Sequence, residues 1–284
     1  MASCIFTNIR NVNYEEITCL YPFLRSGYSA FEVKHDPAHV LHWMMESPQV
    51  PILAVVLYGV GIVLGQSYFR DRPAWNWRQT MSIWNLGLAV FSFIGFIRVL
   101  PYTLHILGTN TLQQALCTDP ESTYGSGSTG LWVNLFILSK FPELIDTFFI
   151  VVHKKPLIFL HWYHHITVLL YCWHSYVTHT PSGIFFVQMN YGVHSVMYFY
   201  YFLMAIKIRP PWAMMVTVLQ ISQMFVGVAL TVLSFIYVGS ENCTISHSNN
   251  LAAFLMYGSY LFLFLQFFIS RYLVKSTKAK KKKE

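Results

Sequence analysis

The sequence predicts an all-α integral membrane protein with seven transmembrane helices. Of its 284 residues, 55% are hydrophobic and only 11% are charged, whereas about 25% of residues in soluble domains carry a charge. The mean hydropathy of +0.44 agrees, and seven stretches come close to the roughly 20 apolar residues that a bilayer-crossing helix needs. The net charge of +7 does not indicate a nucleic-acid-binding face, because 7 of the 19 Lys and Arg residues lie from Arg271 onward.

The expected spans follow one another with short connections. A Pro/Gly turn at residues 179–183 separates the fourth span from the fifth and favours a tight helical hairpin. The third span contains Lys140, Glu143 and Asp146, and ionisable residues in a span tend to face a cavity or one another. The seven predicted spans are residues 50–69, 80–100, 131–152, 157–176, 183–206, 212–238 and 251–272.

The loop charges predict the orientation of the chain. The connections after the first, third and fifth spans and the C-terminal tail contain Lys and Arg, but those at 101–130, 177–182 and 239–250 contain none. Basic loops stay on the cytosolic side of a membrane. We therefore expect a multi-pass protein with a lumenal N-terminus and a cytosolic C-terminus.

Three parts are expected along the chain. Residues 1–49 form a lumenal N-terminal segment without the pattern of a cleavable signal peptide, residues 50–272 form the membrane domain, and residues 273–284 form a basic cytosolic tail. The tail ends Lys281-Lys282-Lys283-Glu284, which places lysines as in the dilysine retrieval signals of endoplasmic reticulum membrane proteins. An ordinary basic anchor is the alternative.

The five cysteines are too few and too scattered for a metal knuckle or a disulfide framework. Cys117 and Cys243 nevertheless both fall in predicted lumenal loops, where an oxidising compartment allows them to pair. Two unpaired thiols are the alternative. The sequence Asn242-Cys243-Thr244 is also a glycosylation sequon, which a bridge at Cys243 would disfavour.

The fourth span begins with three imidazoles in one helical turn, within an uncharged run from Pro156 to Ile206. At about 3.6 residues per turn, His161, His164 and His165 can face one cavity. One buried histidine is more often a satisfied core residue, but three in an uncharged span indicate a reactive site.

Polar residues in the neighbouring spans are candidate partners of this site. Residues three or four apart share a helix face, and their structural alternatives are ion pairing, hydrogen bonding between helices and plain helix packing. The candidates are Lys140, Glu143 and Asp146 in the third span, Asn190 and His194 in the fifth, and Gln220 and Gln223 in the sixth.

Taken in order, these four segments resemble the signatures of the ELO family of very-long-chain fatty acid elongases. The resemblance covers about residues 50 to 275, and residues 156–165 and 190–194 resemble most the members that extend saturated and monounsaturated chains. The four segments are Lys140-Phe-Pro-Glu143-Leu-Ile-Asp146-Thr147, His161-Trp-Tyr-His164-His165, Asn190-Tyr-Gly-Val-His194 and Thr217-Val-Leu-Gln220-Ile-Ser-Gln223.

The resemblance implies a 3-oxoacyl-CoA synthase that condenses a long-chain acyl-CoA with malonyl-CoA, with six helices around a central substrate tunnel. By motif position, His164 would form an acyl-imidazole and His194 would act as the second catalytic group, with His165 in the same cluster. His161 and Asn190 would contact the reacting end of the substrate. Cys172 lies about 10 Å further along the helix than the cluster, too far to replace the imidazole as nucleophile.

The remaining polar residues receive supporting roles. Asp146 or Glu143 could orient the histidine cluster, because a nucleophilic imidazole needs its second nitrogen held, and Lys140 could meet the thioester or the CoA arm. We count Gln220 and Gln223 with the substrate-binding candidates. The CoA phosphates would meet cytosolic Lys and Arg, although ordinary basic loops are the alternative; these residues are Lys154, Lys155, Lys207 and Arg209.

No cofactor and no metal are expected, since acyl-CoA and malonyl-CoA are substrates. The expected surroundings are lipids of the endoplasmic reticulum, the reductases and dehydratase of the elongation cycle and a possible second copy of the chain, and nucleic acid is not expected.

Two other classes of protein share features of the sequence. A di-iron desaturase or hydroxylase also carries an H-x-x-H-H box, and His35 and His39 imitate a further one. The predicted topology, however, places the box toward the cytosol and the other histidines toward the lumen; these are His35, His39, His42, His174 and His179. A seven-helix receptor or transporter fits the span count but has no need of three adjacent imidazoles.

Overall fold

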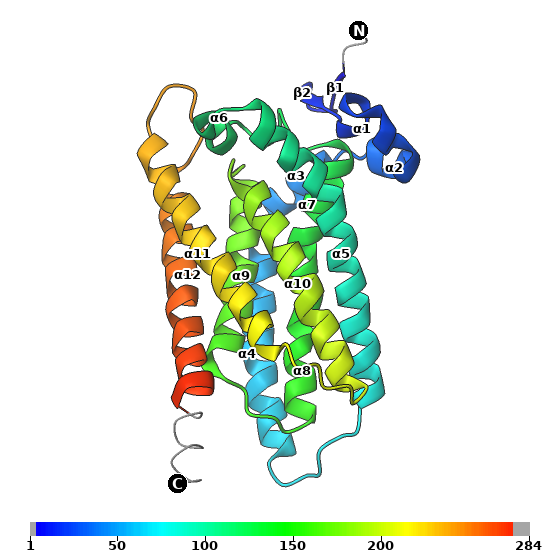
Figure 1. Ribbon diagram of the computed structural model, residues 1–284, viewed down its shortest axis with the longest axis vertical. Coiled ribbons are helices and arrows are strands. Elements are labelled where there is room, and N and C mark those ends of the chain that lie inside the picture. Colours follow the sequence, from blue (N-terminus) through cyan, green and yellow to red (C-terminus); the bar gives the residue numbers. More distant parts are fainter. Residues whose placement is uncertain (1–3, 275–284) are drawn as a thin grey trace.

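Long helices run side by side along the main axis of the computed structural model, which describes residues 4–274 (Figure 1). The predicted dilysine ending, Lys281 to Glu284, lies outside the described residues. The long helices and the segments that continue them are α4 (Gln49–Phe69), α5 (Arg78–Thr109), α7 (Gly127–Ser139), η2 (Pro142–Leu144), α8 (Ile145–Val152), α9 (Phe159–Val177), α10 (Gly183–Ala205), α11 (Ala213–Tyr237), α12 (His247–Phe268) and the π-helical segment η3 (Ile269–Val274).

Length and composition identify membrane-crossing candidates among these helices. In residues 4–274, four qualify: α4, α5, α11, and α12 together with η3. Helix α9 has 19 residues and α10 has 23, and neither contains Asp, Glu, Lys or Arg. The chain is therefore a mostly helical membrane protein, and the count of seven spans stays a prediction.

The third predicted span is not one continuous helix. Helix α7 ends at Ser139, a 3₁₀ turn follows from Pro142, and α8 begins at Ile145. Proline has no backbone N–H to donate and its ring clashes with the preceding turn. The expectation of an unbroken helix over residues 131–152 was wrong, and the break displaces Lys140 and Glu143 from regular helix geometry.

Helix α5 extends past the expected end at residue 100. It continues through Pro101 to Thr109, where Val99 and Tyr102 are buried. Its contact with α10 depends on glycine, because a Cβ at Gly95 would lie 2.4 Å from the ring of Tyr191. Small residues at such contacts let membrane helices approach closely.

A small cap covers one end of the bundle (Figure 1). It contains an antiparallel hairpin, which an all-α prediction does not include, and we call this end the cap end. Its elements are β1 (Ile5–Thr7), β2 (Asn13–Glu15), α1 (Ile17–Leu20), the 3₁₀ helix η1 (Pro22–Gly27), α2 (Ala30–Val33), α3 (Ala38–Glu46) and α6 (Leu112–Cys117).

Buried hydrogen bonds attach the cap to the bundle. The carboxylate of Glu16 accepts hydrogen bonds from the backbone N–H of Ser128 (3.0 Å) and from its hydroxyl (2.7 Å). Ser128 lies in the first turn of α7, where a carboxylate satisfies free N–H groups and complements the helix dipole. Glu16 therefore holds the N-terminal segment against α7.

Two disulfides lie at the cap end. Cys117–Cys243 joins α6 to the connection between α11 and α12, as predicted. Cys4–Cys19 closes the N-terminal hairpin region. The five cysteines were expected to be too few and too scattered for a disulfide framework, and the Cys4–Cys19 bridge was not predicted. It forms because the hairpin folds residue 4 back beside α1.

Candidate active site

The break between α7 and α8 presents a buried ion pair. Lys140 Nζ lies 2.6 Å from Glu143 Oε1, which also accepts a hydrogen bond from Ser139 Oγ at 2.9 Å. Lys140 and Glu143 are only 2% and 4% exposed. A buried charge pair of this kind persists only where each charge has close partners. The ion pairing that the sequence offered as the structural alternative is therefore present, and a role of these residues in catalysis stays a prediction.

Helix α10 adds Asn190 and His194 to this pair. Lys140 Nζ donates to Asn190 Oδ1 at 3.4 Å, and Asn190 Nδ2 lies 3.2 Å from His194 Nε2. Because the amide oxygen faces the lysine, the amide nitrogen is the donor toward His194. His194 Nδ1 lies 3.9 Å from Glu143 Oε2, so both ring nitrogens face this polar network.

The three clustered histidines lie in the first turns of α9. The ring centroid of His165 is 4.6 Å from that of His161 and 5.6 Å from that of His164. The ring of His164 lies 5.0 Å from that of Tyr260 on α12. His164 lies within electrostatic range of His194, Lys140 and Glu143, so the predicted residues of three spans lie in one region of the bundle.

The partners of the three imidazoles differ. His161 Nε2 lies 2.9 Å from Thr147 Oγ1. In the described residues, the Nδ1 atoms of His164 and His165 are buried and have no hydrogen-bond partner. Buried polar atoms of proteins are normally paired, so these nitrogens have hydrogen-bonding capacity for a ligand.

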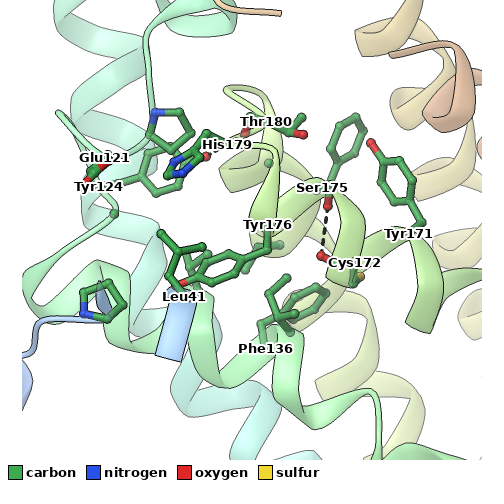
Figure 2. Close-up of a pocket in the computed structure, with 18 of the residues that line it drawn as sticks. Leu41, Glu121, Tyr124, Phe136, Tyr171, Cys172, Ser175, Tyr176, His179 and Thr180 are labelled. Carbon is green, nitrogen blue, oxygen red and sulfur yellow. Dashed lines mark hydrogen bonds between the residues drawn. The ribbon is translucent and has the colours of Figure 1, made fainter. Parts of the chain in front are cut away.

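A cavity lies between Asn190, the neighbour of His194, and the cap end; none of the clustered histidines lines it. Its lining includes Asn190 at one end and Tyr124 and Thr180 near the cap, with Phe136, Val168 and Cys172 between them. Figure 2 shows Tyr171, Cys172, Ser175 and Tyr176 of α9 along its wall. The spacing of His161, His165, Val168, Cys172 and Ser175 puts the histidines and the cavity wall on one face of α9. Cys172 is buried, as expected.

Asp146 forms hydrogen bonds with residues other than the clustered histidines. One carboxylate oxygen accepts from Trp84 Nε1 and the other from Tyr198 Oη, each at 2.7 Å. Asp146 is therefore not the orienting partner of the cluster in this structure. The ring of Tyr198 lies 5.4 Å from that of His194, so Asp146 reaches the site through Tyr198.

The two glutamines lie on α11. Gln220 Nε2 contacts the sulfur of Met197 on α10 at 3.1 Å, and Gln223 is buried. These contacts fit helix packing, and a contact with substrate stays a prediction for both residues.

The predicted CoA-binding residues lie at the end of the bundle opposite the cap, which we call the basic end. The ammonium group of Lys154 donates to the carbonyl oxygens of Arg70 and Arg72, both at 3.1 Å. Arg78 similarly donates to Ala205 and Met204 carbonyls at the end of α10. Lys155, Lys207 and Arg209 lie in the connections at this end and are exposed, so these three offer their charges more freely than Lys154.

Sequence reasoning missed several residues around the cluster. Tyr58 of α4 bonds Thr147, and Thr167 of α9 bonds Tyr260 of α12. Trp84 of α5 bonds Asp146. No spacing within its own helix links any of these groups to its partner on another helix, although Thr147 lies within a recognised segment.

The histidines that the desaturase alternative would need lie away from the cluster of His161, His164 and His165. His174 and His179 follow it by more than two turns of α9, and α3, which carries His39 and His42, contacts the far half of α9 through Trp43 and Trp173. Among the described residues, no group of three His, Cys, Asp or Glu side chains is arranged to hold a metal ion.

The chain is similar to curated proteins along most of its length. The profile of the ELO: GNS1/SUR4 family matches residues 43–282. The chain is 42% identical over 253 residues to very long chain fatty acid elongase 6 of Gallus gallus, which covers 88% of this chain and 95% of that protein. It is 40% identical over 253 residues to the Homo sapiens protein of the same name, with the same coverages of 88% and 95%. It is 36% identical over 281 residues to fatty acid elongase 3 of Trypanosoma brucei brucei, with coverages of 89% and 93%.

Proposed function

The chain belongs to the ELO (GNS1/SUR4) family of fatty acid elongases, and on this premise we propose that it holds the acyl group on His164 before condensation. As a 3-oxoacyl-CoA synthase, it joins an acyl-CoA to malonyl-CoA and releases CoA and carbon dioxide. The observation that carries the acyl-enzyme is the position of His164. Its Nδ1 atom is buried and has no hydrogen-bond partner among the described residues, and the imidazole lies within electrostatic range of Lys140, Glu143 and His194.

The first half-reaction transfers the acyl group to the imidazole, a recognised covalent catalyst. The unprotonated nitrogen of His164 attacks the thioester carbonyl carbon, and the C–S bond breaks. The N–H proton of the imidazole leaves with the thiolate as free CoA. His161 and Asn190 contact the reacting carbonyl, and His165 packs beside both of the other box histidines.

The second half-reaction forms the new carbon–carbon bond. Malonyl-CoA loses its carboxylate as carbon dioxide, and the resulting enolate carbon attacks the acyl carbon. The acyl–nitrogen bond then breaks and the imidazole regains a proton. We propose that His194 stabilises the enolate. Asn190 Nδ2 donates to its Nε2 and fixes the ring, so Nδ1 carries the hydrogen that the enolate oxygen would accept.

The acyl tail occupies the cavity between Asn190 and the cap. The lining is mainly apolar or aromatic where Phe136, Val168 and Phe186 face it, which suits an alkyl chain. Six helices ring this tunnel in our proposal, and bulky side chains near the cap limit the chain length. The resemblance of residues 156–165 and 190–194 supports saturated and monounsaturated chains.

CoA enters at the basic end. Lys155, Lys207 and Arg209 are exposed there and complement its phosphates, while Lys154 orders the neighbouring loop through two carbonyl groups. The reaction needs no metal or cofactor in this mechanism, because imidazoles and fixed dipoles supply the chemistry.

We place the chain in the endoplasmic reticulum membrane with seven spans, a lumenal cap end and a cytosolic basic end. Both disulfides lie at the cap end, which fits an oxidising lumen, and the positive-inside rule fits the basic end. The 3-oxoacyl product must next be reduced and dehydrated, so we propose the reductases and dehydratase of the cycle as partners. A homodimer is a further possibility within this proposal.

Incubation of purified enzyme with acyl-CoA alone tests the mechanism. We expect stoichiometric CoA release and an intact mass increased by one acyl group, located on His164. His164→Ala should abolish both, and His194→Ala should abolish condensation with labelled malonyl-CoA while the protein stays folded. Absence of an adduct from the active enzyme would overturn the acyl-enzyme mechanism. A panel of saturated, monounsaturated and polyunsaturated acyl-CoAs tests the substrate class.

A further inference from the structure

Helix α4 is the most peripheral of the long helices, yet one of its hydroxyl groups reaches the histidine cluster. Of its 21 residues, only Pro51, Tyr58 and Phe69 are buried in the described structure. Tyr58 lies at the middle of the helix, where its ring is 6.3 Å from that of His165. A polar group in the middle of a membrane-crossing helix costs free energy unless it has a hydrogen-bond partner. The partner of the Tyr58 hydroxyl therefore indicates why a tyrosine stands at this position.

The partner of Tyr58 connects it to His161. Tyr58 Oη lies 2.6 Å from Thr147 Oγ1, and Thr147 Oγ1 lies 2.9 Å from His161 Nε2. These two contacts are the only hydrogen bonds of the three side chains within residues 4–274. They form a linear relay from α4 through α8 to α9.

The relay has one direction in which both hydroxyl hydrogens are paired. His161 Nδ1 is not among the buried side-chain atoms that lack a partner in the described residues, so its hydrogen does not decide the direction. If Tyr58 donates to Thr147, then Thr147 can donate its own hydrogen to His161 Nε2. If His161 donated instead, the hydrogen of the Tyr58 hydroxyl would lack an acceptor; if both donated to Thr147, the hydrogen of Thr147 would lack one. An unpaired buried donor costs free energy, so the first direction is favoured.

We propose that Tyr58 and Thr147 are positioning residues that hold neutral His161 as the tautomer protonated at Nδ1. Nδ1–H then remains available to donate to the carbonyl oxygen of the thioester when His164 attacks it, which is where negative charge develops. This inference rests on the proposed function. It makes α4 part of the condensing site, although none of the four recognised segments includes it.

The alternative is that Tyr58 only packs α4 against the bundle. Both roles predict some loss of stability when the hydroxyl is removed. The two roles differ in their effect on the reaction rate. If Tyr58 only packs α4, its loss lowers the fraction of folded enzyme and leaves the rate of the folded enzyme unchanged. If the relay operates, its loss slows the first half-reaction of the folded enzyme, and this effect depends on Thr147.

The experiment compares Tyr58→Phe, Thr147→Val, Thr147→Ser and the double variant Tyr58→Phe/Thr147→Val in purified, folded enzyme. Tyr21→Phe is the matched control, because the hydroxyl of Tyr21 also has one hydrogen bond with an imidazole, at 3.1 Å from His105 Nδ1, in the cap and outside the recognised segments. The measured quantities are the rate of CoA release from acyl-CoA alone, steady-state kcat and KM with malonyl-CoA, and the thermal midpoint.

We expect Tyr58→Phe and Thr147→Val each to slow CoA release by about ten- to a hundredfold, since misorientation of a reacting group can cost this much. KM for acyl-CoA should change less than about twofold. The double variant should be no slower than the slower single variant, and Thr147→Ser should restore most of the rate. Nitrogen-15 spectra of histidine-labelled enzyme should show His161 protonated at Nδ1 in the wild type and a mixture of tautomers in Tyr58→Phe.

Additive effects of the two substitutions, an equal loss in Tyr21→Phe, or His161 protonated at Nε2 in the wild type would each overturn the relay. Failure of the proposed acyl-enzyme mechanism can be distinguished from failure of the relay. If wild-type enzyme condenses substrates but releases no CoA from acyl-CoA alone, the acyl-enzyme is wrong, while the tautomer spectrum and the kcat of condensation still decide the relay. If Tyr58→Phe does not fold, Thr147→Val against Thr147→Ser makes the same comparison.

Discussion

The ammonium group of Lys140 lies 2.6 Å from the carboxylate of Glu143, at the break where α7 gives way to α8. The pair is buried, and Lys140 also contacts Asn190 while Glu143 faces His194. It therefore joins the helix break to α10. The geometry of His194 depends on both charges remaining paired.

Loss of one partner of this pair should destabilise the protein more than loss of both. Removing one member of a buried ion pair leaves an uncompensated charge and costs about 3–5 kcal/mol, whereas neutral replacement of both is often tolerated. We expect lower thermal midpoints for Lys140→Met and for Glu143→Gln than for the double variant Lys140→Met/Glu143→Gln. All three should lose condensation activity, and Lys34→Met, at an exposed lysine, serves as control. A double variant at the sum of the two losses would show that the charges act independently.

Asp146 should affect turnover through Tyr198 rather than through substrate binding. Its oxygens accept from Trp84 and Tyr198, and Tyr198 packs on His194. Asp146→Asn replaces an acceptor by a donor that faces another donor, which costs about 1–3 kcal/mol. We expect a lower kcat with little change in KM for acyl-CoA, and Tyr198→Phe should lower kcat similarly. Steady-state kinetics of both variants test this prediction. A raised KM with normal kcat would instead support direct contact between Asp146 and the substrate.

The two disulfides should differ in their contribution to stability. In a chain-entropy account, a bridge across 126 residues contributes about 5 kcal/mol and a bridge across 15 residues about 3 kcal/mol. Cys243→Ser should therefore lower the thermal midpoint more than Cys19→Ser. A reductant should lower the thermal midpoint of the wild type. It should not change the thermal midpoint of a variant in which all four disulfide-bonded cysteines are replaced. The reverse order of the two single variants would contradict the loop-length argument.

The sequence predicted which polar residues lie close together because these residues fall in short segments; their catalytic roles stay predictions. The spacing of His161, His164 and His165 places them on one part of α9, and the same reasoning pairs Asn190 with His194. These relationships are local to one helix, so the period of the helix determines them. The Cys117–Cys243 bridge followed from topology, because both loops lie on the same side of the bundle.

Relationships between helices were harder to predict. Tyr58 and Thr147 are separated by 89 residues, and nothing in an apolar run indicates which helix it adjoins. The break at Pro142 had a visible cause, but hydropathy averaged over residues 131–152 concealed it. The cap depends on single contacts such as Glu16 with Ser128, which only the folded chain brings together.

The cap should also make stability depend on pH through Glu32. Burial alone would raise the pKa of this carboxyl, but hydrogen bonds from the Ser29 backbone, the Trp132 indole and the Arg98 guanidinium together lower its pKa below the ordinary 4.5. Arg98 Nε lies 2.7 Å and Trp132 Nε1 2.9 Å from Glu32 Oε1. The carboxylate thus joins α2 to α5 and α7.

Because the pKa of Glu32 is lower in the folded chain than in the unfolded chain, its stabilisation is fully present above the unfolded pKa and is lost as the pH falls through the folded pKa. We expect the wild-type thermal midpoint to fall below about pH 4.5. Glu32→Gln should be destabilised by about 2 kcal/mol at pH 7, the scale of charge-assisted hydrogen bonds, and should approach the wild type in acid. Glu241→Gln, at an exposed position, should follow the wild-type curve throughout. Parallel curves for Glu32→Gln and the wild type from pH 7 to pH 3 would mean that the charge of Glu32 does not hold the cap.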